Sequence, residues 1–263
     1  LWHRNKPINP DTGVKNPTIV NMSWGYFSRY LQITGGNYRG TPWTDTIRRT
    51  EFGMTGANDD GFYVHPIRVA SVDTDIQELI DEGIHVVIAS GNSFHKIDVP
   101  GGSDYNNYYT SASFGDVYYH RGGSPYDDQA FIVGNLDSTV TLTDKEQKAQ
   151  SSETGPGVDL YAPGTNIMAA ASRISVFESG SYFPEPFYKQ ANISGSSMAA
   201  PQISGLLALY LQLNPTATPA QAKASIMNSA HDTTLYTTGL DNDYTNFRSV
   251  MGGNNLLGYN KFN

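Results

Sequence analysis

Residues 68–90 read RVASVDTDIQELIDEGIHVVIAS, and this stretch decides the fold class of the chain. Its first part predicts a helix with one apolar face, formed by Val72, Ile76, Leu79 and Ile80. Gly83 is expected to end that helix, and the apolar run HVVIAS at 85–90 predicts a short buried strand. A similar run, TIVNMSW at 18–24, comes earlier in the chain. Strand, helix and strand in this order predict a βαβ unit and therefore a parallel sheet.

Two further apolar runs extend the predicted sheet, AFIVGNL at 130–136 and VDLYAP at 158–163. The runs are nearly continuous rather than alternating, as expected for strands that are covered on both faces. We therefore expect an α/β fold of three layers, in which helices cover both faces of a mostly parallel, doubly wound sheet.

Two helices are predicted in the last third of the chain. The first follows Ser197, has Pro201 close to its first turn, and buries residues at helical spacing, namely Ile203, Leu206, Leu207, Tyr210 and Leu211. The second begins with Thr218 as N-cap, Pro219 in the first helical position and Gln221 two residues later. This arrangement is typical of a capping box.

Three segments, 26–64, 93–129 and 172–191, are rich in Gly, Tyr, Ser, Asn and Asp. They are expected to be long surface loops or hairpin insertions, which often border binding sites. We expect residues 1–263 to form one domain that carries these insertions.

The composition argues against several functional classes. The formal net charge is −8 and no cluster of Lys and Arg is present, which disfavours a nucleic-acid-binding protein. No apolar run approaches the length of about 20 residues that a transmembrane helix needs. The absence of cysteine excludes disulfides, thiolate metal sites and a cysteine nucleophile.

The stretch NISGSSMAAPQISG at 192–205 places Ser197 where a glycine turn opens into a helix, which is how a chain can present a nucleophile. A degenerate nucleophile elbow of an α/β-hydrolase would look similar. That fold needs a strand directly before the serine and an acid and then a histidine after it. Here only His231 follows, without a convincing acid in between, so this alternative is disfavoured.

Four stretches resemble motifs of the subtilases, the subtilisin-like serine peptidases, and they occur in the order of that family. They are VNMSWG (20–25), GIHVVIASGNS (83–93), SSETGPGVDLYAPGTNI (151–167) and GSSMAAP (195–201). The resemblance covers roughly residues 17–230 and implies the subtilisin-like fold.

The resemblance also implies roles for individual residues. Ser197 corresponds to the nucleophile, and Asn92 to the side chain that stabilises the oxyanion. The substrate cleft is expected to be lined by Ser23, Trp24, Gly25, Ala89, Ser90 and Gly91. A serine at the start of a helix also offers its own backbone N–H to the oxyanion.

The general base is not evident. In a subtilase the catalytic Asp and His both precede the strand that here lies at 18–24. Asp11 in PDTGV superficially resembles the Asp motif, but it follows no strand and is interpreted as a turn residue. His95 is the histidine that the resemblance places nearest the site, and it is interpreted as a loop histidine. We therefore expect the Asp and His on an absent N-terminal segment or a separate cleaved chain, docked over an otherwise exposed sheet edge.

The sequence thus predicts a serine endopeptidase that acts on peptides or proteins, in which this chain is the C-terminal, serine-bearing part. No metal or cofactor is expected; calcium is suggested by the resemblance alone, and Asp59-Asp60 is interpreted as a turn. Arg121, near the expected floor of the specificity pocket, suggests acidic substrates, although a solvated loop arginine is the simpler interpretation. The alternative is a catalytically inactive structural or binding protein of a larger assembly, such as a virus particle. The localisation stays open, with extracellular or virion-associated placement compatible with either function.

Overall fold

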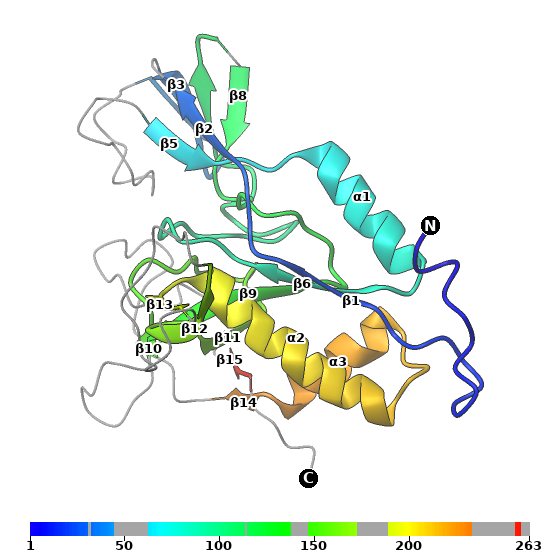
Figure 1. Ribbon diagram of the computed structural model, residues 1–263. Coiled ribbons are helices and arrows are strands. Elements are labelled where there is room, and N and C mark those ends of the chain that lie inside the picture. The colour runs from blue at the N-terminus through cyan, green and yellow to red at the C-terminus, as the bar shows by residue number, and fades with distance from the viewer. Residues whose placement is uncertain are drawn as a thin grey trace.

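The computed structural model describes residues 1–30, 33–44, 63–113, 115–137, 147–172, 189–232 and 256–258. Its main sheet runs in the order β1-β6-β9-β11-β15-β14, and β10 pairs with β9 (Figure 1). The strands are β1 (Ile19–Met22), β6 (His85–Ala89), β9 (Phe131–Asp137), β10 (Gln147–Lys148), β11 (Leu160–Pro163), β14 (His231–Asp232) and β15 (Leu256–Leu257). β1, β6, β9, β11 and β15 are parallel, whereas β10 and β14 are antiparallel to their neighbours. The four predicted strands and their parallel arrangement are confirmed.

Helices cover both faces of this sheet, which explains why its strands are continuously apolar. On one face, α1 (Ala70–Asp81) packs Ile76 and Ile80 with Val86 and Ile88 of β6. On the other face, α2 (Ser196–Leu213) packs against Val87 and Ala89, with α3 (Pro219–Ser229) behind it. Figure 1 shows α1 on one side of β6 and β9 and the pair α2 and α3 on the other.

The predicted helix ends are also confirmed. Gly83 adopts a left-handed φ of 77° directly after the C-cap of α1, a conformation that favours glycine. At the start of α3, Gln221 N donates to Thr218 Oγ1 at 3.3 Å, and Thr218 N donates to Gln221 Oε1 at 3.0 Å. This is the capping box that the sequence predicts.

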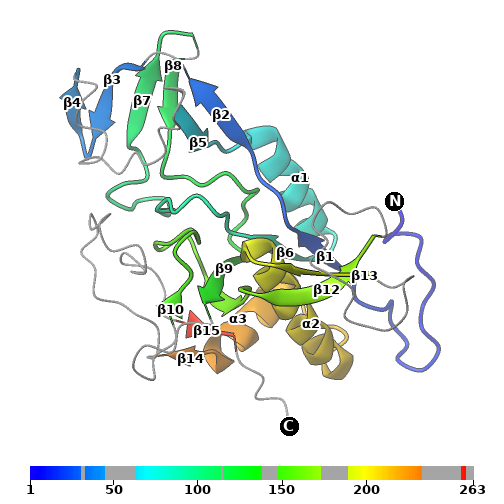
Figure 2. The same ribbon diagram turned by 60° about the vertical axis from the view of Figure 1, so that its left-hand side comes forward.

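Two of the predicted insertions pair with each other and form a second sheet. It has the order β4-β3-β7-β8, with β3 (Ile33–Tyr38) and β4 (Thr41–Trp43) from one insertion and β7 (Tyr108–Ser111) and β8 (Gly115–Tyr118) from the other. Figure 2 shows this sheet apart from the main sheet. It has a small core of its own, formed by Ile33, Trp43, Tyr109, Val117 and Tyr119. The described parts of these two segments therefore form paired strands, in agreement with the predicted alternative of hairpin insertions.

The remaining strands form two antiparallel pairs, one at the two ends of the first insertion and one that flanks the third predicted insertion. β2 (Phe27–Tyr30) pairs antiparallel with β5 (Tyr63–Pro66), and β12 (Ile167–Ala171) pairs antiparallel with β13 (Lys189–Ile193). Much of the third predicted insertion, at 173–188, lies outside the described residues, as does Asp59-Asp60. None of the helices described in the structure is long and apolar enough to cross a membrane.

A buried carboxylate links the two insertions that form the second sheet. Asp104 accepts hydrogen bonds from Arg39 Nε at 2.7 Å and from Lys96 Nζ at 2.8 Å. Burial alone would raise the pKa of Asp104, but these two cations hold it below its usual range. Since Arg39 belongs to the first insertion and both Lys96 and Asp104 to the second, this network connects the insertions through charge as well as through β pairing.

Lys223 of α3 binds groups that directly precede β9 and β11, and its replacement is the subject of a first prediction. Its Nζ donates to the carbonyl of Asp128 at 2.8 Å, that of Ala130 at 2.7 Å and the carboxylate of Asp159 at 2.9 Å. We expect Lys223→Met to lower the free energy of unfolding by about 3 kcal/mol, because Asp159 then stays largely buried without a cation. Urea unfolding measures this loss. The control is Lys15→Met, which removes an exposed lysine and should change stability by less than about 0.5 kcal/mol; equal midpoints for both variants would contradict the prediction.

Candidate active site

The residues predicted for the site meet in one cavity of about 200 Å³ at the carboxyl ends of β1 and β6, beside the first turn of α2. This edge is where open α/β sheets commonly bind their ligands. All of the predicted site residues line the cavity: Ser23, Trp24, Gly25, Ala89, Ser90, Gly91, Asn92 and Ser197. The cavity is completed by Phe27, Pro66, Gly123, Ser124, Glu153 and Ser196. Three stretches that are distant in sequence are thereby brought together.

Pro201 explains how the end of β1 is held against α2. Pro201 lies inside α2 and has no N–H, so the carbonyl of Ser197, four residues earlier, receives no helical hydrogen bond from it. Ser23 Oγ donates to that carbonyl instead, at 3.1 Å. Ser197 Oγ in turn makes a long contact of 3.5 Å to the carbonyl of Ser23. The proline therefore opens a position on the helix that the serine after β1 occupies.

A second set of hydrogen bonds holds the end of β6 against the same helix. Ser196 N and Ser196 Oγ both donate to Asn92 Oδ1, at 2.8 Å and 3.1 Å. Gly91 N donates to Ser196 Oγ at 3.1 Å. Since Ser196 offers a backbone N–H, the side-chain atom that faces it must be the amide oxygen. Nδ2 of Asn92 is then left as the donor that the described residues do not engage.

Gly195 makes the turn into α2 that this arrangement needs. Its φ of 153° and ψ of 165° belong to a region that is essentially restricted to glycine. A Cβ at this position would lie 3.3 Å from Nδ2 of Asn92. The glycine before the two serines therefore permits both the turn and the close approach of Asn92.

Glu153 is the one charged residue among the described residues that line the cavity, and the sequence does not single it out. It is 1% exposed. Its carboxylate accepts hydrogen bonds from the backbone N–H of Ser93, at 3.2 Å, and of His95, and its own N–H donates to the carbonyl of Gly91 at 3.2 Å. A Cβ on Gly91 would lie 2.8 Å from Glu153 Cγ, so the glycine leaves the space that this side chain fills. Burial raises the pKa of Glu153 to about 8.

The one sign of Glu153 in the sequence is an acidic residue within SSETGPGVDLYAPGTNI (151–167), one of the four stretches that resemble subtilase motifs. Its partners, Gly91, Ser93 and His95, belong to a stretch about 60 residues earlier. Sequence spacing does not reveal that pairing.

None of the described residues that line the cavity is a histidine. His95 lies in the loop after β6 and is buried, and burial lowers its pKa to about 4. His85 is in β6, as expected, and the side chains of His65 and His231 are outside the described residues. The interpretation of His95 as a loop histidine agrees with this placement.

Asp11 lies in a turn, as expected, with its N–H donating to Asn9 Oδ1 at 2.9 Å. The surrounding hairpin, dark blue in Figure 1, lies beyond the C-terminal end of α2, whereas Ser197 is in the first turn of that helix. Asp11 is therefore remote from the cavity.

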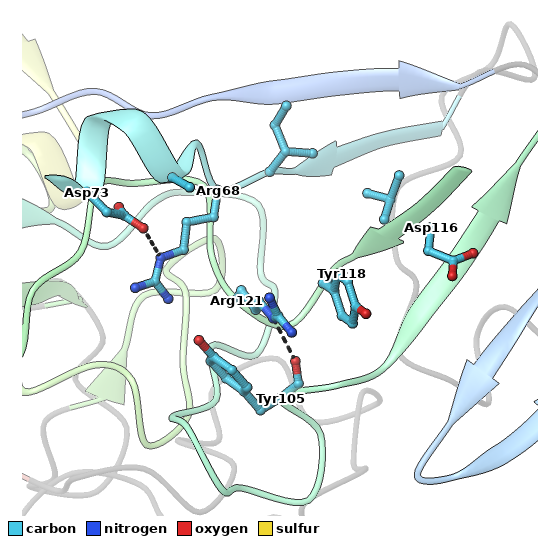
Figure 3. A pocket seen from close by; sticks show the side chains of 9 residues that line it. Arg68, Asp73, Tyr105, Asp116, Tyr118 and Arg121 are labelled. Carbon is cyan, nitrogen blue, oxygen red and sulfur yellow. Dashed lines mark hydrogen bonds and ion pairs between the residues drawn. The ribbon is translucent and has the colours of Figure 1, made fainter. Parts of the chain in front are cut away.

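Arg121 lies in a different pocket, of about 400 Å³, and does not line the cavity beside Ser197. Figure 3 shows it next to Tyr105 and Tyr118. Its guanidinium is 3.7 Å from the ring centroid of Tyr118, and Arg121 Nε donates to the carbonyl of Tyr105 at 3.1 Å. The possibility that Arg121 selects acidic substrates in the specificity pocket is thereby wrong, because its charge is held elsewhere.

Comparison with known proteins agrees with this geometry. The sequence model of the subtilase family, peptidase S8, matches residues 10–252. The chain belongs to the subtilase family. The match is longer than the resemblance visible in the four motifs, and it identifies a family of serine endopeptidases.

Several subtilases are similar to this chain. Subtilisin-like serine protease Pen ch 18 of Penicillium rubens is 29% identical over 192 residues, which are 70% of this chain and 30% of that protein. Subtilisin BL of Lederbergia lenta is 28% identical over 221 residues, covering 81% of this chain and 64% of that protein. An extracellular serine proteinase of a Thermus species is 29% identical over 157 residues, covering 60% and 28%. The chain thus spans less than two thirds of the length of these relatives.

A solved structure, that of a cold-adapted subtilisin-like serine proteinase, matches 94% of this chain and 56% of its own, with 21% identity and a TM-score of 0.49. Among the residues that the structure describes, no three His, Asp or Glu side chains lie close enough together to hold a metal ion.

The raised pKa of Glu153 predicts how stability depends on pH. A carboxyl group whose pKa is higher in the folded than in the unfolded state stabilises the fold while it is protonated, and this contribution is lost as the pH rises toward the folded pKa. For Glu153 that loss extends from the ordinary value of 4.5 to about 8. We expect the melting temperature of the native chain to fall relative to that of Glu153→Gln between about pH 5 and about pH 8.

Differential scanning calorimetry of the two proteins across this range measures the effect. The buried histidines His85, His95 and His120 have lowered pKa values and titrate in both proteins, so their contribution cancels in the difference. A difference in melting temperature that does not change with pH would contradict the prediction.

Proposed function

We propose that this chain is the serine-bearing part of a subtilisin-like endopeptidase that hydrolyses peptide bonds through an acyl-enzyme on Ser197. The observation that carries the proposal is the double hydrogen bond from Ser196 to Asn92 Oδ1, which leaves Nδ2 of Asn92 available next to Ser197. Peptides or proteins are the substrates, in keeping with the family. Ser23, Trp24 and Gly25 form one side of the substrate cleft, and Ala89, Ser90 and Gly91 form the other.

In the proposed reaction, Ser197 Oγ attacks the carbonyl carbon of the substrate, and the resulting oxyanion needs preorganised donors. Two donors are available. Ser197 is the second residue of α2, where a backbone N–H has no partner within the helix, and Asn92 supplies Nδ2 from the end of β6. The positive end of the α2 dipole favours the same negative charge. A catalytic histidine supplied from outside the present sequence takes the proton of Ser197 Oγ and passes it to the leaving amine as the C–N bond breaks, which releases the first product and leaves the acyl-enzyme. Water, deprotonated by the same histidine, then hydrolyses the acyl-enzyme and releases the second product and free Ser197.

We further infer that the catalytic Asp and His lie on a segment or chain outside the present sequence, docked against β1. Two observations support this. The described residues around Ser197 supply no histidine, and β1 is the last strand of the sheet, so one of its edges has no neighbour among the described strands. Beside that edge is a pocket of about 550 Å³ with apolar side chains from β1 and α1, including Met22, Val72, Ile76 and Leu79. Trp24 is 45% exposed there. An exposed strand edge next to apolar side chains is a surface that proteins normally cover.

The alternative of an inactive structural protein gains no specific support. The relatives reported above are named as proteases, and none of their names refers to a virus particle. An unreactive serine in an intact fold would nevertheless favour it.

A serine-directed fluorophosphonate tests the nucleophile. We expect a covalent adduct on Ser197 of the native protein, because such probes label serines that a base activates. Mass spectrometry of the undenatured protein should locate the adduct and identify a co-purifying segment with the Asp and His. Ser197→Ala should abolish labelling. Ser204→Ala, two turns further along α2, is the matched control and should leave it intact. Absence of an adduct on a folded protein would reject the proposed function.

The oxyanion role of Asn92 is tested by Asn92→Ala. We expect kcat for peptide hydrolysis to fall about 10²–10³-fold with little change in KM, a range measured on subtilisin rather than derived from this chain. The loss falls on kcat because Nδ2 engages a charge that exists only in the transition state. Asn214→Ala, at the far end of α2, is the control and should leave kcat within about twofold. A rise in KM with unchanged kcat would instead assign Asn92 to substrate binding.

A further inference from the structure

Two polar side chains in the cavity beside Ser197 are incompletely satisfied: the Ser90 hydroxyl has no hydrogen bond, and the Glu153 carboxyl has hydrogen bonds but no ion pair. Ser90 is 1% exposed, and its Oγ makes no hydrogen bond to any described residue. Glu153 is equally buried, and no Lys, Arg or His side chain of the described structure forms an ion pair with its carboxylate. A carboxylate without an ion pair and a hydroxyl without a hydrogen bond on the same cavity point to a ligand that supplies both a hydrogen bond and positive charge.

The ionisable groups packed around Glu153 are already engaged. Lys148 of β10 lowers the pKa of Glu153 slightly, but its ammonium donates to backbone carbonyls, among them those of Ala149 and Ser152, each within 3 Å. Tyr161 of β11 donates its hydroxyl to Thr154, and His95 is kept neutral by burial. The carboxylate therefore has no ion pair among the described residues, and the charge of Lys148 opposes the effect of burial only in part.

Both oxygens of Glu153 keep acceptor capacity for such a ligand. Each accepts one backbone N–H, from Ser93 or His95, whereas a carboxylate oxygen can accept two hydrogen bonds. The two backbone hydrogen bonds hold the carboxylate in place, and each oxygen can still accept a hydrogen bond from a ligand.

The size and walls of the cavity restrict the ligand further. Its volume of about 200 Å³ is below the range of about 300–1,000 Å³ that is typical of pockets for drug-sized molecules, and suits one amino-acid side chain. Trp24, Phe27 and Pro66 provide apolar surface along it. An apolar stem with a cationic end matches these walls and the polar groups together.

Other side chains match less well. An apolar side chain would leave Ser90 Oγ without a hydrogen bond and Glu153 without a counter-charge, which polar sites reject strongly. An acidic side chain would place a second negative charge beside Glu153. A neutral amide could bond Ser90, but it would not favour the ionised form of Glu153 as a cation does.

We propose that this cavity is the pocket for the residue on the acyl side of the cleaved bond and that it selects lysine or arginine, with Glu153 as the specificity-determining residue and Ser90 as a second hydrogen-bond partner. The proposal rests on the proposed function and names its substrate class. Gly91 is also required for this pocket, because a side chain at position 91 would collide with Glu153.

The raised pKa of Glu153 predicts that binding of a cationic side chain depends on pH, which a purely steric preference would not. Without ligand the carboxyl is mostly protonated at neutral pH, since its pKa is about 8. A bound cation favours the ionised form, so binding should release a proton and strengthen as the pH rises. Lys148, Tyr161 and His95 surround the carboxyl with either ligand, so their effects cancel in a comparison of two ligands.

The test is the binding of two short peptides that are identical except for arginine or its neutral isostere citrulline at the C-terminal residue, both as amides. Isothermal titration calorimetry on the native protein, in two buffers of different ionisation enthalpy, measures affinity and proton release. We expect the arginine peptide to bind about tenfold or more tightly at about pH 8.5, and to release close to one proton at about pH 7. The citrulline peptide should release none.

Three variants test which residues cause the preference for arginine and the proton release. Glu153→Gln should bring the two affinities together and abolish proton release, while Ser90→Ala should weaken the arginine peptide several-fold and leave the proton release. Asp116→Asn removes an exposed carboxylate from the other pocket and is the control for general electrostatics; it should leave the affinity ratio unchanged. Equal affinities in the native protein, or a preference that survives Glu153→Gln, would overturn the proposal.

The same protein treated with the fluorophosphonate separates the two proposals. An adduct on Ser197 without preference for arginine rejects the specificity of the pocket and keeps the peptidase. Selective binding of the arginine peptide without an adduct supports the pocket and rejects the peptidase.

Discussion

The hydrogen bond from Ser196 N to Asn92 Oδ1 is the contact on which the site depends, because it joins the end of β6 to the start of α2. β6 is buried on both faces, so its position is set by the packing of α1 and α2 rather than by the loop that follows it. The amide of Asn92 is thereby oriented by the core of the domain. A donor held in this way costs little reorganisation when charge develops beside it.

Pro201 extends the same principle to β1. A proline inside a helix normally destabilises it, since one helical hydrogen bond is lost. Here the carbonyl that would have accepted that bond accepts one from Ser23 Oγ, so the helix gains a connection to the neighbouring strand at the point where Ser197 is presented. The local irregularity of α2 is therefore compensated by tertiary contact, and the two walls of the cleft are tied to a single helical turn.

The parts of the structure that the sequence predicts are those with a strong local signal. The strand at 85–90 and the helix before it are visible because burial imposes apolar residues at a definite period, and the start of α3 because Thr218 and Gln221 cap it locally. The second sheet is not predicted, since nothing in the spacing of Ile33 or Tyr109 says that their strands are neighbours. Ser197 and Asn92 are found through motifs, whereas Glu153 becomes meaningful only when Gly91 is seen against it.

Glu153 shows why such a residue is worth its energetic cost. A buried carboxyl with no resident cation is destabilising when ionised, and replacement by a neutral side chain of similar shape would relieve this penalty. The chain nevertheless places Gly91 opposite Glu153, which leaves space for its side chain. Two backbone N–H groups also donate to the carboxylate of Glu153. Proteins depart from the stable arrangement in this way mainly where function requires it. Glu153 lies on the wall of the cavity that contains Ser197. We therefore attribute the destabilisation caused by its burial to the recognition of a positively charged side chain.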